Sequence, residues 1–234
     1  MIQKILEGDF GKKIDKEVQS KFGNFSVLNI GSYNEKLNLI MGSNPFYVVA
    51  VNQVLRDNGL KIRTATQANL EQMPESEKMN KDRIYIDTAL VLRYKEGPKG
   101  YLSRDLANQL FNFKGLEQKM PAMISLRGLE LKRDAYSEYG LSFKIGDEVE
   151  TFYAPIFNGP SGQFSSKDID EKTGLPKKLE NGNQRILHTN NSCLSRLLSV
   201  GPNLESREDN LKTYWQNNAG RVVLIGDEIP TDLK

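Results

Sequence analysis

The chain has 234 residues, 38% of them hydrophobic and 26% charged, so it can bury a substantial core and is not expected to be disordered. Its 32 basic and 30 acidic residues leave a formal charge of only +2, which provides no overall field for attracting nucleic acid or an anionic membrane. One cysteine, Cys193, and one histidine, His188, exclude an internal disulfide and supply too few soft ligands for a structural zinc site.

The N-terminal part of the chain predicts one interrupted helix followed by two short strands. Residues 1–22 have the apolar spacing of an amphipathic helix, which Gly8 and Gly11 should break into two pieces. Strands are predicted over 25–30 and over 37–41, with a polar, glycine-containing turn between them.

The strongest helix signal covers residues 45–58. Ser43 or Asn44 can cap it, Pro45 occupies a first-turn position where a missing N–H costs nothing, and Gly59 can end it. Its side chains are apolar nearly all the way round the first two turns, which predicts burial on several sides. We therefore expect a central helix wrapped by sheet.

The next segment predicts two strands and two helices. Residues 60–66 alternate like a strand, and 67–73 predict a short helix. Residues 83–94 are β-branched, aromatic and apolar enough to form an interior strand, and Asp87 is the one acid within it. A turn then leads to a helix that Ser103 can cap.

The middle of the chain carries hairpin signals. From 121 to 157 three successive strands are expected, which together predict an antiparallel meander. Residues 158–184 are the most polar and glycine-rich part of the chain. They are longer than an ordinary connection in a compact domain, so we expect either a functional loop or partial disorder.

The C-terminal part predicts two more helices and a last strand. Ser192 can cap a helix of leucines that Gly201 ends. Ser206 and Asp209 resemble a capping box that opens a second helix. Residues 221–225 then predict a final strand, and a strand this late in the chain is expected to pair beside earlier ones, so a single domain is favoured over two.

One group of residues could carry metal chemistry. Glu130 and Lys132 are two apart in a predicted strand and so share one face of it. Together with Asp87 they could supply two carboxylates that hold magnesium and an ammonium that stabilises developing charge. Glu148 or Glu150 could be a further ligand.

This arrangement is similar to the sequence motif of the PD-(D/E)XK nucleases over these three residues, and that resemblance implies a metal-dependent nuclease. No proline precedes Asp87, however, and a predicted helix separates its strand from the strand of Glu130 and Lys132. The favoured interpretation is a half-buried strand with Leu129 and Leu131 facing inward and the two charged residues facing solvent.

Other patterns are weaker. Residues 168–174 resemble a calcium loop, but a lysine occupies a ligand position and the glycine comes one residue late. No strand-turn-helix elbow surrounds Cys193 or its neighbouring serines, and no glycine-rich phosphate-binding motif occurs. Aromatic and basic residues interleave over 132–136, but acidic neighbours dilute their charge.

Together these patterns predict a single α+β domain over residues 1–234, with a mixed, mostly antiparallel sheet packed on a central buried helix and a long polar loop at 158–184. The expected function is that of a cytoplasmic, non-enzymatic binding or assembly protein without a cofactor, whose partner is another protein or a second copy of itself. The net charge does not indicate a nucleic-acid partner, and no apolar run of about 18 residues indicates a membrane segment. The alternative is a metal-dependent nuclease in which Asp87 and Glu130 bind magnesium and Lys132 assists.

Overall fold

The computed structural model describes residues 2–23, 25–29, 33–73, 84–93, 100–114, 119–206, 210–212 and 217–227. Helices and strands both occur, in the α+β arrangement that the sequence predicts. The helical elements are α1 (Gly8–Phe22), α2 (Pro45–Asp57), α3 (Gln67–Glu71), α4 (Tyr101–Lys114) and the 3-10 turns η1 (Pro155–Asn158) and η2 (Asn217–Ala219). Among the described helices, none is long and apolar enough to cross a membrane.

The strands are β1 (Ile2–Ile5), β2 (Tyr33–Asn34), β3 (Leu39–Ile40), β4 (Arg63–Thr64), β5 (Tyr85–Leu92), β6 (Ala122–Ser125), β7 (Leu129–Arg133), β8 (Leu141–Ile145), β9 (Thr151–Tyr153), β10 (Gly162–Phe164), β11 (Arg185–Thr189), β12 (Leu194–Val200), β13 (Asn203–Ser206), β14 (Gly220–Arg221) and β15 (Val223–Gly226). The largest sheet has the order β10-β11-β13-β12-β5-β6-β9, with β14 also paired to β5. Two of its pairings, β11 with β13 and β14 with β5, are parallel and the others are antiparallel. The predicted mixed, mostly antiparallel sheet is therefore confirmed.

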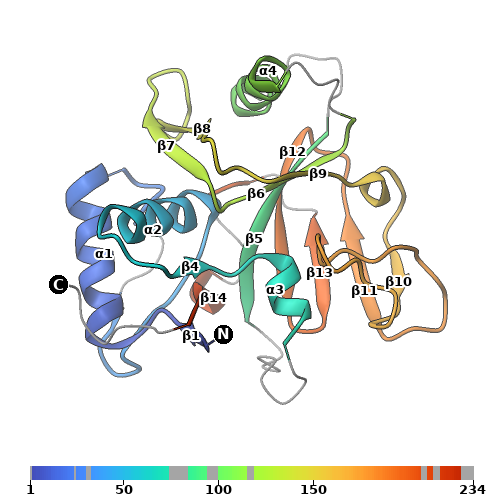
Figure 1. The fold of residues 1–234 in the computed structure, drawn as a ribbon, viewed down its shortest axis with the longest axis horizontal. Coiled ribbons are helices and arrows are strands. Elements are labelled where there is room, and N and C mark those ends of the chain that lie inside the picture. Colours follow the sequence, from blue (N-terminus) through green and yellow to red (C-terminus); the bar gives the residue numbers. More distant parts are fainter. Residues whose placement is uncertain are drawn as a thin grey trace.

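Helix α2 is the central helix that the sequence predicts. The Asn44 side chain caps it by accepting a hydrogen bond from the Tyr47 N–H at 2.9 Å, and Pro45 is its first residue. Residues 45–55 are all buried. Helix α1 and strands β4, β5 and β7 contact α2, so it is covered on several sides (Figure 1). A helix that is apolar all the way round is stable only when other parts of the protein cover every side of it.

Strand β5 divides the core into two parts. All eight of its residues are buried, and alternate side chains point to opposite faces of the sheet. Leu90 and Leu92 join the cluster around α2, whereas Ala89 and Val91 join a second cluster with Phe157. In Figure 1, α1 and α2 lie to one side of β5 and strands β10 to β13 to the other. The predicted interior strand is confirmed.

The prediction for the N-terminal segment is only partly right. Residues 2–5 form β1, which pairs with β15 and so leaves the helix to begin at Gly8. Gly11 lies within α1 instead of breaking it. It packs closely on the preceding chain, since a Cβ there would lie 3.2 Å from the Leu6 carbonyl carbon. The described residues 25–29 form a turn where a strand was expected.

The predicted meander over 121–157 is right in the antiparallel pairing of β7 with β8 and wrong in the pairing of the strand that follows. Strands β7 and β8 pair only with each other, while β6 pairs with β5 and with β9. Strands β6 and β9 pair with each other although β7 and β8 lie between them in the chain. The β7–β8 hairpin therefore projects from the main sheet (Figure 1). Gly128, just before the hairpin, makes this exit possible, because a Cβ there would lie 2.6 Å from the Glu148 carbonyl.

Residues 194–200 form β12, not the predicted helix. Leu194 pairs with Leu92 and Val200 with Tyr85, apart from a bulge where Thr88 has no direct partner. Leucines at helical spacing are compatible with this strand because both of its faces are buried, so its apolar residues need not alternate. Most of the second predicted helix, which Ser206 was expected to open, lies outside the described residues.

The last predicted strand is confirmed and closes the domain. Residues 223–226 form β15 between β1 and β4, so the end of the chain pairs with its beginning. Residues 220–221 form β14, which pairs with β5. These pairings connect the smaller three-stranded sheet to the main one.

The polar segment 158–184 is folded against the body of the protein. It contains β10, and its side chains Phe164 and Leu175 are buried in the second part of the core. Gly174 has a φ of +70° and lies directly against the backbone of Gln67 and Ala68 at the start of α3. This contact requires glycine, since a Cβ would come within 2.5 Å of the Ala68 nitrogen.

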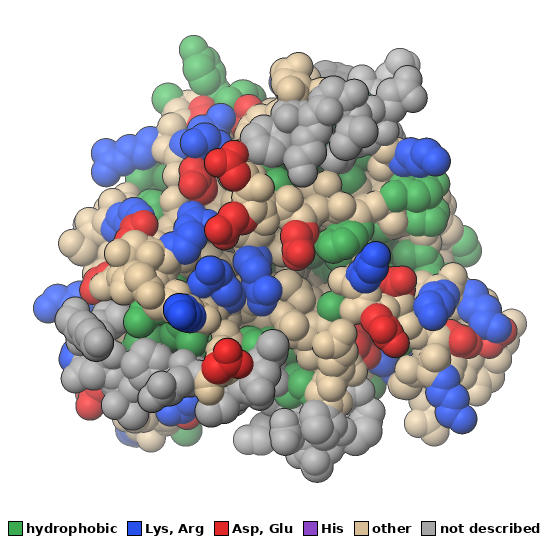
Figure 2. Space-filling model, in the orientation of Figure 1, with side chains coloured by type: hydrophobic (Ala, Val, Ile, Leu, Met, Phe, Trp, Pro, Cys, Tyr) green, Lys and Arg blue, Asp and Glu red, His purple; other side chains and the backbone are tan. Residues whose placement is uncertain are grey.

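Charged side chains of both signs are interspersed over the face shown in Figure 2, and no broad area of that face carries a single sign. This distribution agrees with the small net charge of the chain. On the described part of this face, nothing resembles the continuous basic stripe that would track a nucleic-acid backbone.

Replacing Gly174 should test how firmly the 158–184 segment is docked. Gly174→Ala introduces both a strained left-handed backbone and the clash with α3, whereas Gly182→Ala introduces the strain alone, because Gly182 has a φ of +90° and open space around it. We expect Gly174→Ala to lower the free energy of unfolding by about 1–3 kcal/mol more than Gly182→Ala does. Chemical denaturation measures both; equal losses would show that the segment can move away from α3.

Asp15 should make stability depend on pH. The Tyr47 hydroxyl donates a 2.6 Å hydrogen bond to it, but burial outweighs this bond and raises the pKa of Asp15 above 3.8. The folded state therefore binds the proton more tightly, and this contribution to stability is complete below pH 3.8 and is lost as the pH rises through the folded-state pKa. Asp15→Asn should thus be more stable than the parent at pH 7, with a difference that shrinks on acidification. Denaturation at several pH values tests this, and a difference independent of pH would contradict it.

Candidate functional site

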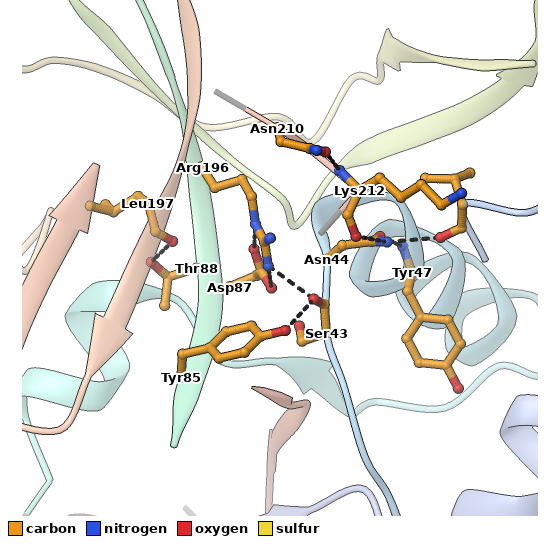
Figure 3. Close-up of polar contacts among 11 residues, drawn as sticks. Ser43, Asn44, Tyr47, Tyr85, Asp87, Thr88, Arg196, Leu197, Asn210 and Lys212 are labelled. Carbon is orange, nitrogen blue, oxygen red and sulfur yellow. Dashed lines mark hydrogen bonds and ion pairs between the residues drawn. The ribbon is translucent and has the colours of Figure 1, made fainter. Parts of the chain in front are cut away.

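Asp87 lies in a fully buried ion pair. Its two carboxylate oxygens accept hydrogen bonds from Nε and Nη2 of Arg196 at 2.7 and 2.8 Å, and both side chains are completely inaccessible to solvent. Figure 3 shows the guanidinium facing the carboxylate across β5 and β12. Such a two-pronged pair has the geometry in which arginine binds carboxylates most strongly.

The ion pair also reaches the start of the central helix. Arg196 Nη2 and the Tyr85 hydroxyl both donate to the Ser43 carbonyl, at 2.9 and 3.0 Å (Figure 3). Burial disfavours the charge on Arg196, but the Asp87 carboxylate overrides it and raises the pKa of the guanidinium. Burial, with Asp87 beside it, raises the pKa of Tyr85. The guanidinium of Arg196 thus stays charged.

Glu130 and Lys132 lie elsewhere, on the β7–β8 hairpin. Glu130 forms ion pairs with Lys144 at 3.2 Å and Arg56 at 3.6 Å, and Lys132 pairs with Asp105 at 3.3 Å. Both side chains are partly exposed, while Leu129 and Leu131, which alternate with them, are buried. The interpretation of β7 as a half-buried strand is confirmed.

The structure does not place the predicted metal ligands on one sheet. Asp87 belongs to the main sheet and Glu130 to the separate hairpin, and each carboxylate already has cationic partners. Among the described residues, no group of three or more histidine, cysteine or acidic side chains is arranged to hold a metal ion. Glu148 and Glu150, the further predicted ligands, are among these described residues and do not complete such a group.

The other sequence patterns have structural explanations. Asp170 in the calcium-like segment accepts hydrogen bonds from the backbone N–H groups of Thr173 and Lys172, and these, led by the Thr173 N–H, lower its pKa. It thus organises an Asx-type turn. His188 lies in β11, and β13 separates that strand from β12, which begins directly after Cys193. The histidine therefore lies on a strand that does not neighbour β12, the strand that Cys193 precedes.

A second buried arginine, which the sequence gave no reason to expect, lies at the end of β5. Arg93 donates to the Phe157 carbonyl at 3.2 Å and to the hydroxyls of Ser195 and Ser206 at 2.9 and 3.1 Å. These acceptors are neutral, and burial lowers the pKa of Arg93 to about 10. The Arg93 N–H also donates to the Cys193 carbonyl at 2.7 Å. Arg93 thereby anchors residues 192–195.

A cavity of about 620 Å³ opens beside this anchored segment. Four parts of the chain form its walls: the start of α4, the β7–β8 turn, the segment that enters β12, and Leu211. We call it the tyrosine cavity, and its lining residues are Gly100, Tyr101, Leu102, Ser103, Tyr136, Glu138, Tyr139, Asn191, Ser192, Cys193, Leu194 and Leu211. Helix α4 and the hairpin lie at the same end of the molecule in Figure 1.

Asp134 organises one wall of the cavity. Its carboxylate accepts hydrogen bonds from the Ser142 hydroxyl at 2.7 Å, the Tyr101 hydroxyl at 2.8 Å and the Tyr136 N–H at 3.0 Å. These bonds, led by that from Ser142, lower the pKa of Asp134. The same contact with Asp134 raises the pKa of Tyr101 to about 12. A single carboxylate therefore holds α4 against the β7–β8 turn.

The three tyrosines differ in how they are supported. The Tyr139 ring packs on Phe46 of α2 with centroids 5.0 Å apart, which ties this wall to the core. The Tyr101 and Tyr136 rings are 6.2 Å apart and inclined by 37°. Tyr136 lines the cavity and is at the same time 84% exposed, so its ring is open to solvent.

The described lining of the cavity carries one charged side chain, that of Glu138. Sequence reasoning missed this site because its residues are far apart in the chain. Tyr136 does lie in the aromatic and basic segment 132–136, but the two basic residues there have other partners: Lys132 pairs with Asp105, and the Arg133 guanidinium lies over the Phe25 ring. Only the fold brings Tyr136 next to Tyr101.

No protein-family model, curated protein or solved structure was found to match this chain. Its function must therefore be inferred from the chemistry of its own sites.

The two acids of the predicted metal site should respond very differently to neutralisation. Asp87→Asn would leave Arg196 charged and buried without a counter-ion, which should cost about 3–5 kcal/mol of unfolding free energy. Glu130→Gln removes a partly exposed ion pair and should cost less than about 1 kcal/mol. Thermal and chemical denaturation measure both variants. A mild effect of Asp87→Asn would mean that the ion pair does not hold the sheet to α2.

Proposed function

We propose that this is a cytoplasmic, non-enzymatic binding protein and that the tyrosine cavity holds a small organic ligand. The cavity itself carries the proposal: its volume of about 620 Å³ lies within the roughly 300–1,000 Å³ of small-molecule sites. Its lining combines aromatic and aliphatic side chains with a few polar groups, which is the usual composition of such sites.

The support around the cavity favours binding. Asp134 fixes α4 to the β7–β8 turn, and Arg93 fixes residues 192–195 through its hydrogen bonds to that segment. Walls that are held in place before a ligand arrives lose little conformational freedom on binding. The cavity is therefore preorganised even though its walls come from distant parts of the chain.

The chemistry of the described lining also favours binding over catalysis. It contains one carboxylate and no histidine or lysine, so it lacks an obvious acid and base pair. The Tyr101 hydroxyl, with a pKa of about 12, is a poor base or nucleophile at neutral pH. The cytoplasmic location rests on the single cysteine and the absence of a disulfide framework. Assembly with a protein partner or a second copy remains a prediction.

Alkylation of Cys193 can test the cavity directly, because this thiol lines it and is the only cysteine in the chain. Benzyltrimethylammonium, benzyl alcohol and benzoate are useful probes, since they present one ring with a positive, neutral or negative group. We expect at least one of them to slow the reaction of Cys193 with N-ethylmaleimide and to raise the melting temperature by mass action.

Asn191→Trp provides the blocked control. Asn191 is an exposed lining residue, so a tryptophan there should fill the cavity without disturbing the core, and it should abolish the protection. Tyr153→Ala removes another exposed tyrosine, on β9 outside the cavity, and should leave protection unchanged. If none of the three probes protects Cys193 in the parent protein, the cavity is not a ligand site of this kind.

A further inference from the structure

We propose that the ligand of the tyrosine cavity carries an organic cation, a quaternary or protonated ammonium group, which lies against the rings of Tyr101 and Tyr136 with Glu138 as its counter-ion. This inference rests on the proposed function and identifies the chemical class of the ligand. Three features of the cavity lead to it: the arrangement of the rings, the sign of the charges and the apolar walls.

The two rings are arranged to share one cation. A cation is attracted to the face of an aromatic ring when it lies within about 6 Å of the centroid. Because the centroids of Tyr101 and Tyr136 are 6.2 Å apart and the rings are inclined by 37°, a single group that lies beside the pair can be within that range of both centroids. The Tyr101 hydroxyl also donates a hydrogen bond to Asp134. This hydrogen bond polarises the hydroxyl and increases the electron density of the ring.

The charges around the cavity favour a cation over an anion. Glu138 is the one charged side chain in the described lining, and the carboxylate of Asp134 accepts a hydrogen bond from the Tyr101 hydroxyl. The nearby Lys132 is engaged by Asp105 at 3.3 Å. No lysine or arginine belongs to the described lining, so a phosphate or carboxylate group would find a repulsive carboxylate and no cationic partner there.

The remaining walls suit a bulky alkylammonium group. Leu102, Leu194 and Leu211 line the cavity with little solvent exposure, and they offer apolar surface to the methyl or methylene groups that surround such a nitrogen. A small hydrated metal ion would gain nothing from these leucines. Aromatic rings, one acid and aliphatic walls together form the kind of site that recognises quaternary ammonium ligands.

Choline and 3,3-dimethylbutan-1-ol have nearly the same shape, but in the alcohol a neutral carbon replaces the positive nitrogen of choline. Comparing their affinities therefore separates the effect of charge from the effect of shape. Titration of each against Cys193 alkylation, with calorimetry as a second readout, should show choline binding about 3- to 30-fold more tightly. Tyr136→Ala should remove most of this preference, whereas Tyr136→Phe should keep it, since the ring face carries the attraction. Glu138→Gln should weaken choline and leave the alcohol unaffected.

The outcomes distinguish this inference from the proposed function. Equal or tighter binding of the alcohol would overturn the cation while leaving a ligand cavity in place. Binding of benzyl alcohol or benzoate without binding of either isostere would do the same. A choline preference that survives Tyr136→Ala and Glu138→Gln would move the cation site elsewhere and overturn the assignment. If no probe of either experiment protects Cys193, both proposals fail together. Tyr153→Ala again serves as the matched tyrosine control.

Discussion

The buried pair of Asp87 and Arg196 is the interaction on which the rest of the structure depends. It joins the two central strands, β5 and β12, and through the Ser43 carbonyl it joins both to the beginning of α2. Removing two charges from water is costly, and the cost is offset only when the geometry is nearly ideal and the remaining donors are satisfied. Here both carboxylate oxygens are engaged and the guanidinium has a further carbonyl acceptor. The pair therefore requires one register of β5 against β12, and it places the central helix relative to both.

This register determines what happens at the far end of the same two strands. Arg93 directly follows β5, and residues 192–195 lead into β12, so both are positioned by the pairing of these two strands. Arg93 then anchors that segment through neutral oxygens and the serine hydroxyls. A buried guanidinium has several donors in a fixed plane, so it can hold several chain segments in one arrangement. One wall of the tyrosine cavity is built in this way.

The opposite wall comes from a hairpin that is not part of the main sheet. Strands β7 and β8 pair only with each other, so their position depends on side chains: Tyr139 packs on α2, and Asp134 receives the hydroxyls of Tyr101 and Ser142. Because Asp134 is the common acceptor, the ring of Tyr101, the backbone of Tyr136 and the hairpin form one unit. A binding site on such a unit can be rigid without belonging to a sheet. The unit is also negatively charged, because the common acceptor is the carboxylate of Asp134.

Local signals in the sequence were enough to determine α2 and β5. Asn44, Pro45 and the surrounding apolar residues act within a few positions of one another, and a long β-branched run specifies a buried strand wherever it pairs. The outer face of β7, with Glu130 and Lys132, could also be predicted from alternation. The tertiary structure alone decided that the leucines of β12 form a strand, because burial on both faces removes the need to alternate. It also decided that Asp87 binds Arg196, 109 residues away, and that Tyr101, Tyr136 and Cys193 share a cavity, because contacts between residues so far apart in the chain leave no periodic trace in the sequence.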